Sequence, residues 1–297
     1  MSSPAYGLHL PHFGPIATPQ FMAEVAQAAE SLGFRSLWLS DHVVVPVSWK
    51  TPYPYRDDGV IGLDSAQPFF DPLAVAAWLA GVTSRPEIGI GALVAPYRPP
   101  LVTAKLIGTL DCLAGGRTRM VIGSGWLAEE FQALGVPFAR RGQLTDHTLR
   151  ILTAAFAAHP LHLPGGAVGM EPRPLRQPYP LIVGGHSRVA MRRALSLGHG
   201  WQGTPQHPSE VPALVRALAA EAGGEIPEGF TVSLRIHLSR FDPDGPAAAV
   251  VERVRAALHP RVDEVVLSMV DSEPKRYVRR LEALAGWLGI AADLGGA

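Results

Sequence analysis

The sequence has a single cysteine, Cys112, so no disulfide can form within the chain, and a reducing cytoplasm is the expected compartment. It has no excess of either charge. The 26 basic and 26 acidic residues cancel, which argues against nucleic acid or an anionic membrane as the main partner. No run of about 18 apolar residues is present, so no membrane span is expected. The first residues, MSSPAYGLHLPHFG, lack the basic segment and long apolar core of a signal peptide. No His-x-x-x-His or Cys-x-x-Cys pair occurs, so no metal site is expected.

The chain does have many hydrophobic residues, 47% of the total, in a regular alternation of short apolar runs and helical segments. The helical segments carry start and stop signals. Thr18 can cap a helix that begins at Pro19 and ends at Gly33, and Asp71 precedes Pro72 in the same way. The runs expected to form strands are residues 5–10, 35–40, 87–96, 117–125, 179–185, 199–204, 230–239 and 262–270.

Each of these eight strands is followed by a helical stretch. Most of the strands are continuously apolar, as expected when both faces of a sheet are covered. Eight such units in about 300 residues favour a (β/α)8 TIM barrel over an open sheet, with residues 1–297 forming one domain. Two segments interrupt the rhythm, residues 43–70 and 159–180. We expect both to be insertions at the carboxyl-terminal face of the barrel that act as lids and determine substrate choice.

The second strand is followed directly by Asp41 and His42. In a TIM barrel the carboxyl ends of the strands build the active site, so these two residues are expected at its mouth. Two interpretations remain open at this point. Either the pair is catalytic, or Asp41 caps a turn and His42 is a loop histidine with a structural role.

Four stretches of the chain together resemble the luciferase-like monooxygenase superfamily, specifically its branch that depends on the deazaflavin coenzyme F420. They are residues 28–46, 69–117, 123–142 and 180–201. The resemblance implies a TIM barrel that holds a flavin or deazaflavin at its mouth. It also implies a non-prolyl cis peptide in a bulge of the third strand, at about Ala92–Leu93, which supports the central ring of the cofactor. Without the resemblance, this segment would be read as plain strand.

The resemblance places the cofactor phosphate at the start of the helix after the fifth strand, at Gly184, Gly185, His186, Ser187 and Arg188. The chemistry of these residues agrees with this placement. Glycines let the backbone approach an anion, and the free amides and dipole of a helix start favour negative charge. The alternative is a plain Gly-Gly turn capped by Ser187, which needs no ligand.

The fourth strand ends in Gly123, Ser124, Gly125 and Trp126. The two glycines would let a flat ring or its tail lie against the backbone. A dinucleotide-binding fingerprint is excluded because position 128 is alanine where a third glycine is required. Trp126 is expected either to form a wall of the ring pocket or to be a core or interface aromatic. The two glutamates that follow, at 129 and 130, are interpreted as structural because acids suit a helix start.

Hydride transfer needs a group that supplies or removes a proton, and His42 is the leading candidate. Asp41 is expected either to orient His42 or to form a hydrogen bond with the cofactor ring. His9 and His12, at the end of the first strand, are second candidates for this proton transfer and are expected to contact the substrate. His237 is a weaker candidate on the seventh strand. For these last three histidines a structural role is favoured.

Tyr97 and Arg98, after the third strand, are expected to contact the cofactor tail or the substrate. The sequence departs from the family pattern at Trp126, where some deazaflavin enzymes carry an acid. Two further departures occur. The family often has Asp-Gly-Trp where this chain has His199-Gly200-Trp201, and it often has Asp-Glu where this chain has Asp146-His147.

The hypothesis from the sequence is therefore an F420-dependent oxidoreductase of a small organic substrate, forming a homodimer as the family commonly does. Two alternatives remain: an FMN-dependent monooxygenase on the same barrel, or a non-catalytic flavin-binding relative.

Overall fold

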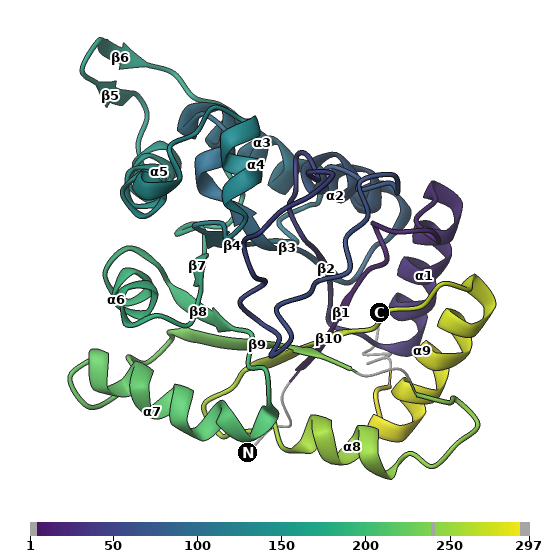
Figure 1. Cartoon of the computed structure of the whole chain (residues 1–297). Coiled ribbons are helices and arrows are strands. Elements are labelled where there is room, and N and C mark those ends of the chain that lie inside the picture. Colours follow the sequence, from purple (N-terminus) through teal and green to yellow (C-terminus); the bar gives the residue numbers. More distant parts are fainter. Residues whose placement is uncertain (1–4, 239–240, 292–297) are drawn as a thin grey trace, which may run out of the picture.

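The computed structural model describes residues 5–238 and 241–291, in which eight parallel strands close into a barrel surrounded by helices (Figure 1). This confirms the TIM-barrel prediction. Around the barrel the strands are β1 (Ala5–His9), β2 (Ser36–Leu39), β3 (Glu87–Val94), β4 (Thr118–Gly123), β7 (Leu181–Gly184), β8 (Gly200–Gly203), β9 (Thr231–His237) and β10 (Glu264–Ser268).

The helices follow the strands as their start and stop signals predict. Thr18 Oγ1 accepts a hydrogen bond from the Phe21 amide at the start of α1, and Gly33 ends this helix with a left-handed φ of 97°. The main helices are α1 (Pro19–Leu32), α2 (Pro72–Val82), α3 (Pro100–Leu113), α4 (Ala128–Ala133), α5 (Arg141–Ala157), α6 (Arg188–Leu197), α7 (Val211–Glu221), α8 (Ala248–Arg255) and α9 (Pro274–Leu288). Three short 3₁₀ helices, η1 (Ala95–Tyr97), η2 (Phe138–Arg140) and η3 (Pro208–Glu210), lie in the connections.

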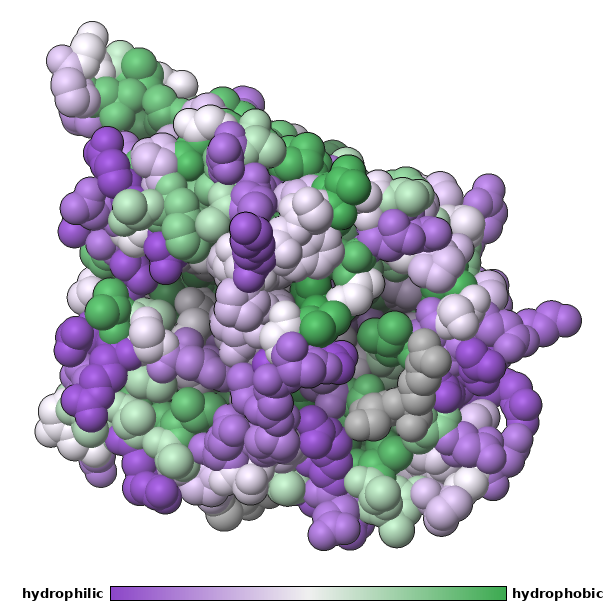
Figure 2. Space-filling view, in the orientation of Figure 1, coloured by the Kyte–Doolittle hydropathy of each residue, from purple (hydrophilic) through white to green (hydrophobic). Residues whose placement is uncertain are grey.

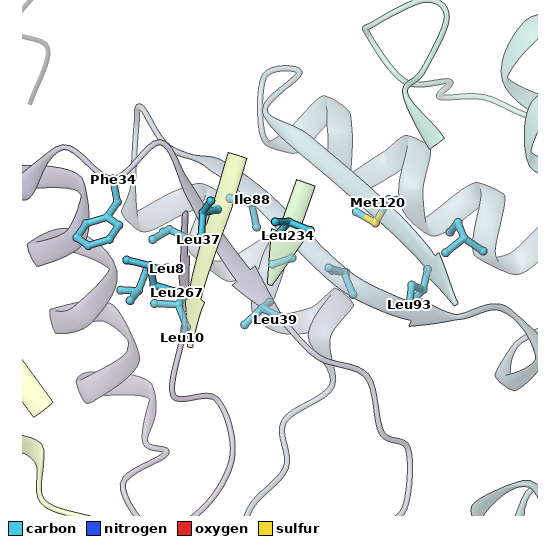
Figure 3. Packing of buried hydrophobic residues seen from close by; sticks show 14 of the residues in the cluster. Leu8, Leu10, Phe34, Leu37, Leu39, Ile88, Leu93, Met120, Leu234 and Leu267 are labelled. Atoms are coloured by element: carbon cyan, nitrogen blue, oxygen red, sulfur yellow. The ribbon is translucent and has the colours of Figure 1, made fainter. Parts of the chain in front are cut away.

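The hydrophobic core has two layers. The larger layer lies between the strands and the helices, and Figure 3 shows Phe34, Leu8 and Leu37 between the strands and a neighbouring helix. The smaller layer fills the barrel around the buried Trp38, together with Val121, Ile182 and Val266. A Cβ atom on Gly89 would overlap the Trp38 ring, so this glycine makes room for the indole. The barrel is therefore a packed core, and open space is confined to its end.

The insertion at residues 43–70 runs across the carboxyl-terminal mouth of the barrel, as predicted (Figure 1). It is fixed at both sides. Glu129 of α4 accepts hydrogen bonds from the Lys50 amide, at 2.7 Å, and from the Thr51 amide, at 3.2 Å. On the opposite side Gln206 Nε2 donates to the Pro54 carbonyl at 3.1 Å. We call residues 43–70 the strap.

The insertion at residues 159–180 does not lie at this face, so its expected role as a lid is wrong. It forms a small hairpin of β5 (Leu161–Leu163) and β6 (Gly166–Val168), which projects from the barrel (Figure 1). It then passes the amino end of β4, where the Tyr179 hydroxyl lies 2.9 Å from Thr118 Oγ1. The reason is topological: a segment that leads from a helix into the next strand arrives at the amino ends of the strands.

Polar and apolar side chains are interspersed over the face of the molecule shown in Figure 2. Of the helices that the structure describes, none is long and apolar enough to cross a membrane.

Candidate active site

A cavity of 1570 Å³ opens at the carboxyl ends of the barrel strands, beneath the strap. Single-ligand pockets in proteins typically measure about 300–1,000 Å³, so this cavity has room for a large cofactor together with a substrate. Six strands contribute lining residues near their carboxyl ends, among them Gly91, Gly123, Gly184, Gln202, Arg235 and Ser268.

The third strand breaks its register between Gly91 and Leu93, and the peptide bond between Gly91 and Ala92 is cis. This is the bulge that the family resemblance implied, one residue earlier than expected. Ala92 lines the cavity, whereas Leu93 is buried in the outer core. Of the two residues predicted to contact the cofactor here, the structure therefore brings only Ala92 to the cavity.

His42 lines the cavity and is held by a residue 88 positions away in the chain. Its Nδ1 donates to Glu130 Oε2 at 2.6 Å. Glu130 is fully buried and accepts three further hydrogen bonds, from the amides of Val43 and Val44 and from the Tyr97 hydroxyl at 2.8 Å. Because Nδ1 is occupied by the carboxylate, Nε2 is the nitrogen that can exchange a proton with a ligand.

Asp41 does not orient His42, contrary to expectation. Its carboxylate forms a two-point ion pair with Arg98, at 2.7 and 2.9 Å, and accepts from the Val94 amide at 2.9 Å. Arg98 also pairs with Asp71, the cap of α2. This network ties the end of β2 to the end of β3. It leaves Arg98, like Tyr97, outside the lining of the large cavity, although both were predicted to contact cofactor or substrate.

His9 and His12 lie behind the cavity and do not line it, so the structure does not bring these predicted substrate contacts to the site. His12 Nδ1 donates to the Leu10 carbonyl at 3.1 Å, and its Nε2 accepts from the Ser40 amide. Burial lowers the pKa of His12 to about 4, which keeps the ring neutral. His9 is hydrogen-bonded to Ser40 Oγ at 2.8 Å, and burial lowers its pKa as well. Both act as structural supports for Ser40.

The residues that end β4 all line the cavity: Gly123, Ser124, Gly125 and Trp126. The glycines are also required by the protein itself. A Cβ on Gly123 would lie 2.7 Å from the Ala92 Cβ, and Gly125 has a φ of 77°. The Trp126 ring lies 6.0 Å from the His42 ring, edge to face, and so forms a wall beside the candidate proton donor.

The start of α6 faces the same cavity through Gly184, Gly185, His186 and Ser187. Gly185 has a φ of 130°, and Ser187 Oγ caps the helix by accepting from the Ala190 amide at 3.1 Å. Arg188 points outward, with an exposed side chain 3.7 Å from Glu221, so it does not reach the cavity as predicted.

Two other arginines line this end of the cavity, and sequence reasoning missed both. Arg193 pairs with Asp146. Arg141 stacks at 4.0 Å over the Phe138 ring, and none of the described acids is within ion-pair distance of it. The arginine that suits a phosphate is therefore Arg141, at the start of α5, and not Arg188.

The strap contributes Tyr53 and Tyr55 to the cavity wall, and these residues were also missed. The ring of Tyr53 lies 5.2 Å from that of Trp126, and Tyr55 lies 5.3 Å from His186. Burial raises the pKa of Tyr55 to about 12, so its hydroxyl stays protonated. The strap thus places two aromatic rings in the wall at the mouth of the cavity.

Over residues 5–291 the sequence matches the family described as luciferase-like monooxygenase. The protein belongs to the luciferase-like monooxygenase family. Members of this family that resemble it include both F420-dependent and FMN-dependent proteins.

An uncharacterized protein of Mycobacterium tuberculosis (strain ATCC 25618 / H37Rv) is 31% identical over 283 residues, covering 89% of this chain and 93% of the relative. An F420-dependent glucose-6-phosphate dehydrogenase of Kineococcus radiotolerans is 29% identical, over 78% of this chain and 67% of the relative. An FMNH(2)-dependent dimethylsulfone monooxygenase of Pseudomonas putida is 26% identical, over 61% of this chain and 52% of the relative.

Among solved structures, an F420-dependent secondary alcohol dehydrogenase in complex with an F420-acetone adduct superimposes with a TM-score of 0.77. The alignment covers 97% of this chain and 99% of that one at 14% identity, a level that supports the shared fold alone.

Proposed function

We propose that this luciferase-like protein is an oxidoreductase that transfers a hydride between coenzyme F420 and a small organic substrate. The observation that carries the proposal is His42, held by Glu130 at 2.6 Å in the wall of a 1570 Å³ cavity that Ala92 in the bulge of β3 also lines. The relative from Kineococcus is an F420-dependent dehydrogenase, which supports the same choice of cofactor.

The residues around the cavity fit such a cofactor. Ala92 and Trp126 offer apolar surface for a flat ring. The amides at the start of α6 and the unpaired guanidinium of Arg141 suit its phosphate. When bound, a deazaflavin supplies a carbon atom that gives or accepts a hydride and reacts poorly with oxygen. The proton that accompanies the hydride is exchanged at Nε2 of His42, while Glu130 holds the ring in position.

An FMN-dependent monooxygenase is the second candidate, because the relative from Pseudomonas uses FMNH(2) according to its name. Fluorescence titration of the purified protein with F420 and with FMN separates the two. We expect F420 to bind at least ten-fold more tightly. Tight FMN binding without F420 binding would reverse the order.

Two arginine variants test the phosphate contacts in the same titration. We expect Arg141→Gln to weaken F420 binding about ten-fold, as the loss of a charge-assisted contact predicts, and Arg188→Gln to leave it unchanged. A non-catalytic relative would bind the cofactor normally but show no turnover with any substrate tested.

A further inference from the structure

Arg235 on β9 lies deep in the cavity and lacks an acidic partner among the residues described. Its Nη1 donates to Ser40 Oγ at 2.9 Å and to the Gly91 carbonyl at 3.3 Å, and Nη2 lies 3.5 Å from Ser268 Oγ. Its buried Nε has no hydrogen-bond partner within residues 5–238 and 241–291. Four other largely buried arginines, Arg98, Arg119, Arg193 and Arg280, each pair with a carboxylate. Arg253, which also lines the cavity, donates to the carbonyls of His237 and Gln206.

His237 lies two residues further along β9, so its side chain projects from the same side of the strand as Arg235. It lines the same cavity, and its buried Nε2 likewise has no partner in the part of the chain that the structure describes. Burial, together with the positive charge of Arg235, lowers the pKa of His237 to about 3. A neutral imidazole still has one N–H to donate.

A buried guanidinium with neutral neighbours alone is costly, and arginines removed from water are normally paired with an anion. Here the surrounding groups are hydroxyls and a carbonyl, which solvate the charge but do not neutralise it. The strap places two protonated phenols, Tyr53 and Tyr55, in the wall of the same cavity. Four side chains able to donate hydrogen bonds thus line the cavity. Asp57 and Asp58 of the strap line it too, but no carboxylate of the described residues lies within ion-pair distance of Arg235.

We propose that Arg235 and His237 bind a carboxylate or sulfonate group of the substrate, so that the protein acts on small organic anions. The proposal rests on the proposed function, because it names the substrate class of the same site. The position of Arg235 fits this role. Its contact with the Gly91 carbonyl places the anion beside the cis bulge, where the ring of the cofactor is expected. The start of α6 and Arg141 form a separate place for the cofactor phosphate.

Calorimetric titration with benzoate and with benzamide, which differ in charge but hardly in shape, tests the proposal. The protein is measured alone and with F420 bound. We expect the wild-type protein to bind benzoate at least ten-fold more tightly than benzamide. In Arg235→Gln the ratio should fall to about one, and Arg235→Lys should retain part of it. Benzenesulfonate in place of benzoate tests the second anion.

Arg176→Gln is the matched control, because Arg176 also has a buried Nε without a partner in the described residues but does not line the cavity. We expect this variant to keep the full preference for benzoate. Thermal unfolding of each variant verifies that it is folded before its binding is compared.

Equal binding of benzoate and benzamide by the wild-type protein would overturn the proposal, and so would an unchanged preference in Arg235→Gln. A third outcome is that Arg235→Gln keeps the preference for benzoate but lowers the midpoint potential of bound F420. This result would also overturn the proposal, because it would show that Arg235 stabilises the reduced cofactor ring and does not bind the substrate. Failure of the proposed function is distinguishable from all of these, because a protein that binds neither F420 nor FMN can still be tested for its preference for benzoate.

Discussion

Glu130 lies in the first turn of α4, where an acidic residue is expected for its interaction with the helix dipole. The structure shows a larger role, since this buried carboxylate accepts four hydrogen bonds and fixes His42 through Nδ1. No local pattern connects two residues that are 88 positions apart. Asp41 is adjacent to His42 in the sequence and was therefore expected to orient it, but its carboxylate pairs with Arg98.

Substitution of His42 and Glu130 tests this pair. We expect His42→Asn to lower kcat about 10²- to 10⁴-fold, the usual contribution of a general acid or base. Glu130→Gln should lower kcat less, because it weakens the charge-assisted hydrogen bond that holds the His42 ring in position but leaves the imidazole in place. Steady-state kinetics, with F420 binding measured alongside, provides the test.

Tyr97→Phe is the control for this pair, because it removes one hydrogen bond to Glu130 and leaves the contact with His42 intact. Its kcat should match that of the wild-type protein. If His42→Asn retained full turnover, the histidine would have no part in proton transfer.

Residues at the ends of strands were predictable. The glycines that end β4 and Trp126 were expected at the mouth from their position, and the glycines that begin α6 and Ser187 from the family resemblance. The structure places them all at the cavity. Arg235 was missed although His237 was noted. The sequence could have indicated Arg235, because side chains two residues apart on a strand project from the same side, and His237 was already a candidate. Arg141 and Tyr53 had no such signal, since their place depends on how distant segments pack.

The two long insertions lie at opposite ends of the barrel, because one follows a strand and the other precedes a strand. The strap follows β2, so it leaves from the carboxyl end of a strand and reaches the mouth. The segment 159–180 precedes β7 and therefore arrives at the opposite end of the barrel. This difference follows from the alternation of strands and helices, so the sequence already contained it. The pairing of β5 with β6, by contrast, involves three residues on each side and had no clear sequence signal.

Removal of the anchor at Glu129 tests whether the strap is a cover. Glu129 Oε1 accepts from two strap amides, and Oε2 accepts from the Thr51 hydroxyl at 2.8 Å. We expect Glu129→Ala to speed hydrogen exchange in residues 50–58 about ten-fold, because hydrogen bonds to a charged group are lost, and to speed cofactor release.

Hydrogen-exchange mass spectrometry and stopped-flow dissociation measure the two effects of this substitution. Glu24→Ala, at an exposed position of α1, is the control and should change neither rate. If Glu129→Ala left the hydrogen-exchange rate of the strap unchanged, the other contacts of the strap would be sufficient to hold it in place.

The barrel as a whole was predictable because its eight apolar runs and their capped helices all indicate one architecture. Self-association of the protein is a prediction that no contact in the structure tests. The relevant feature is α2, whose sequence PLAVAAWLAGV has no polar side chain although the helix lies on the outside of the barrel. A helix that is apolar all round is normally covered on all sides.

We propose that a second copy of the chain covers α2 and the adjacent α3. These helices expose large apolar side chains, 37–64% accessible, at Trp78, Leu101, Val102, Leu106 and Leu113. We expect the wild-type protein to sediment as a dimer at micromolar concentration. Leu106→Glu should give monomers, because dimer formation would bury an unpaired charge. Leu258→Glu, with similar exposure beyond α8, is the control and should stay dimeric. Sedimentation velocity measures all three proteins, and a monomeric wild-type protein, or a Leu106→Glu variant that remains dimeric, would exclude this face as the interface.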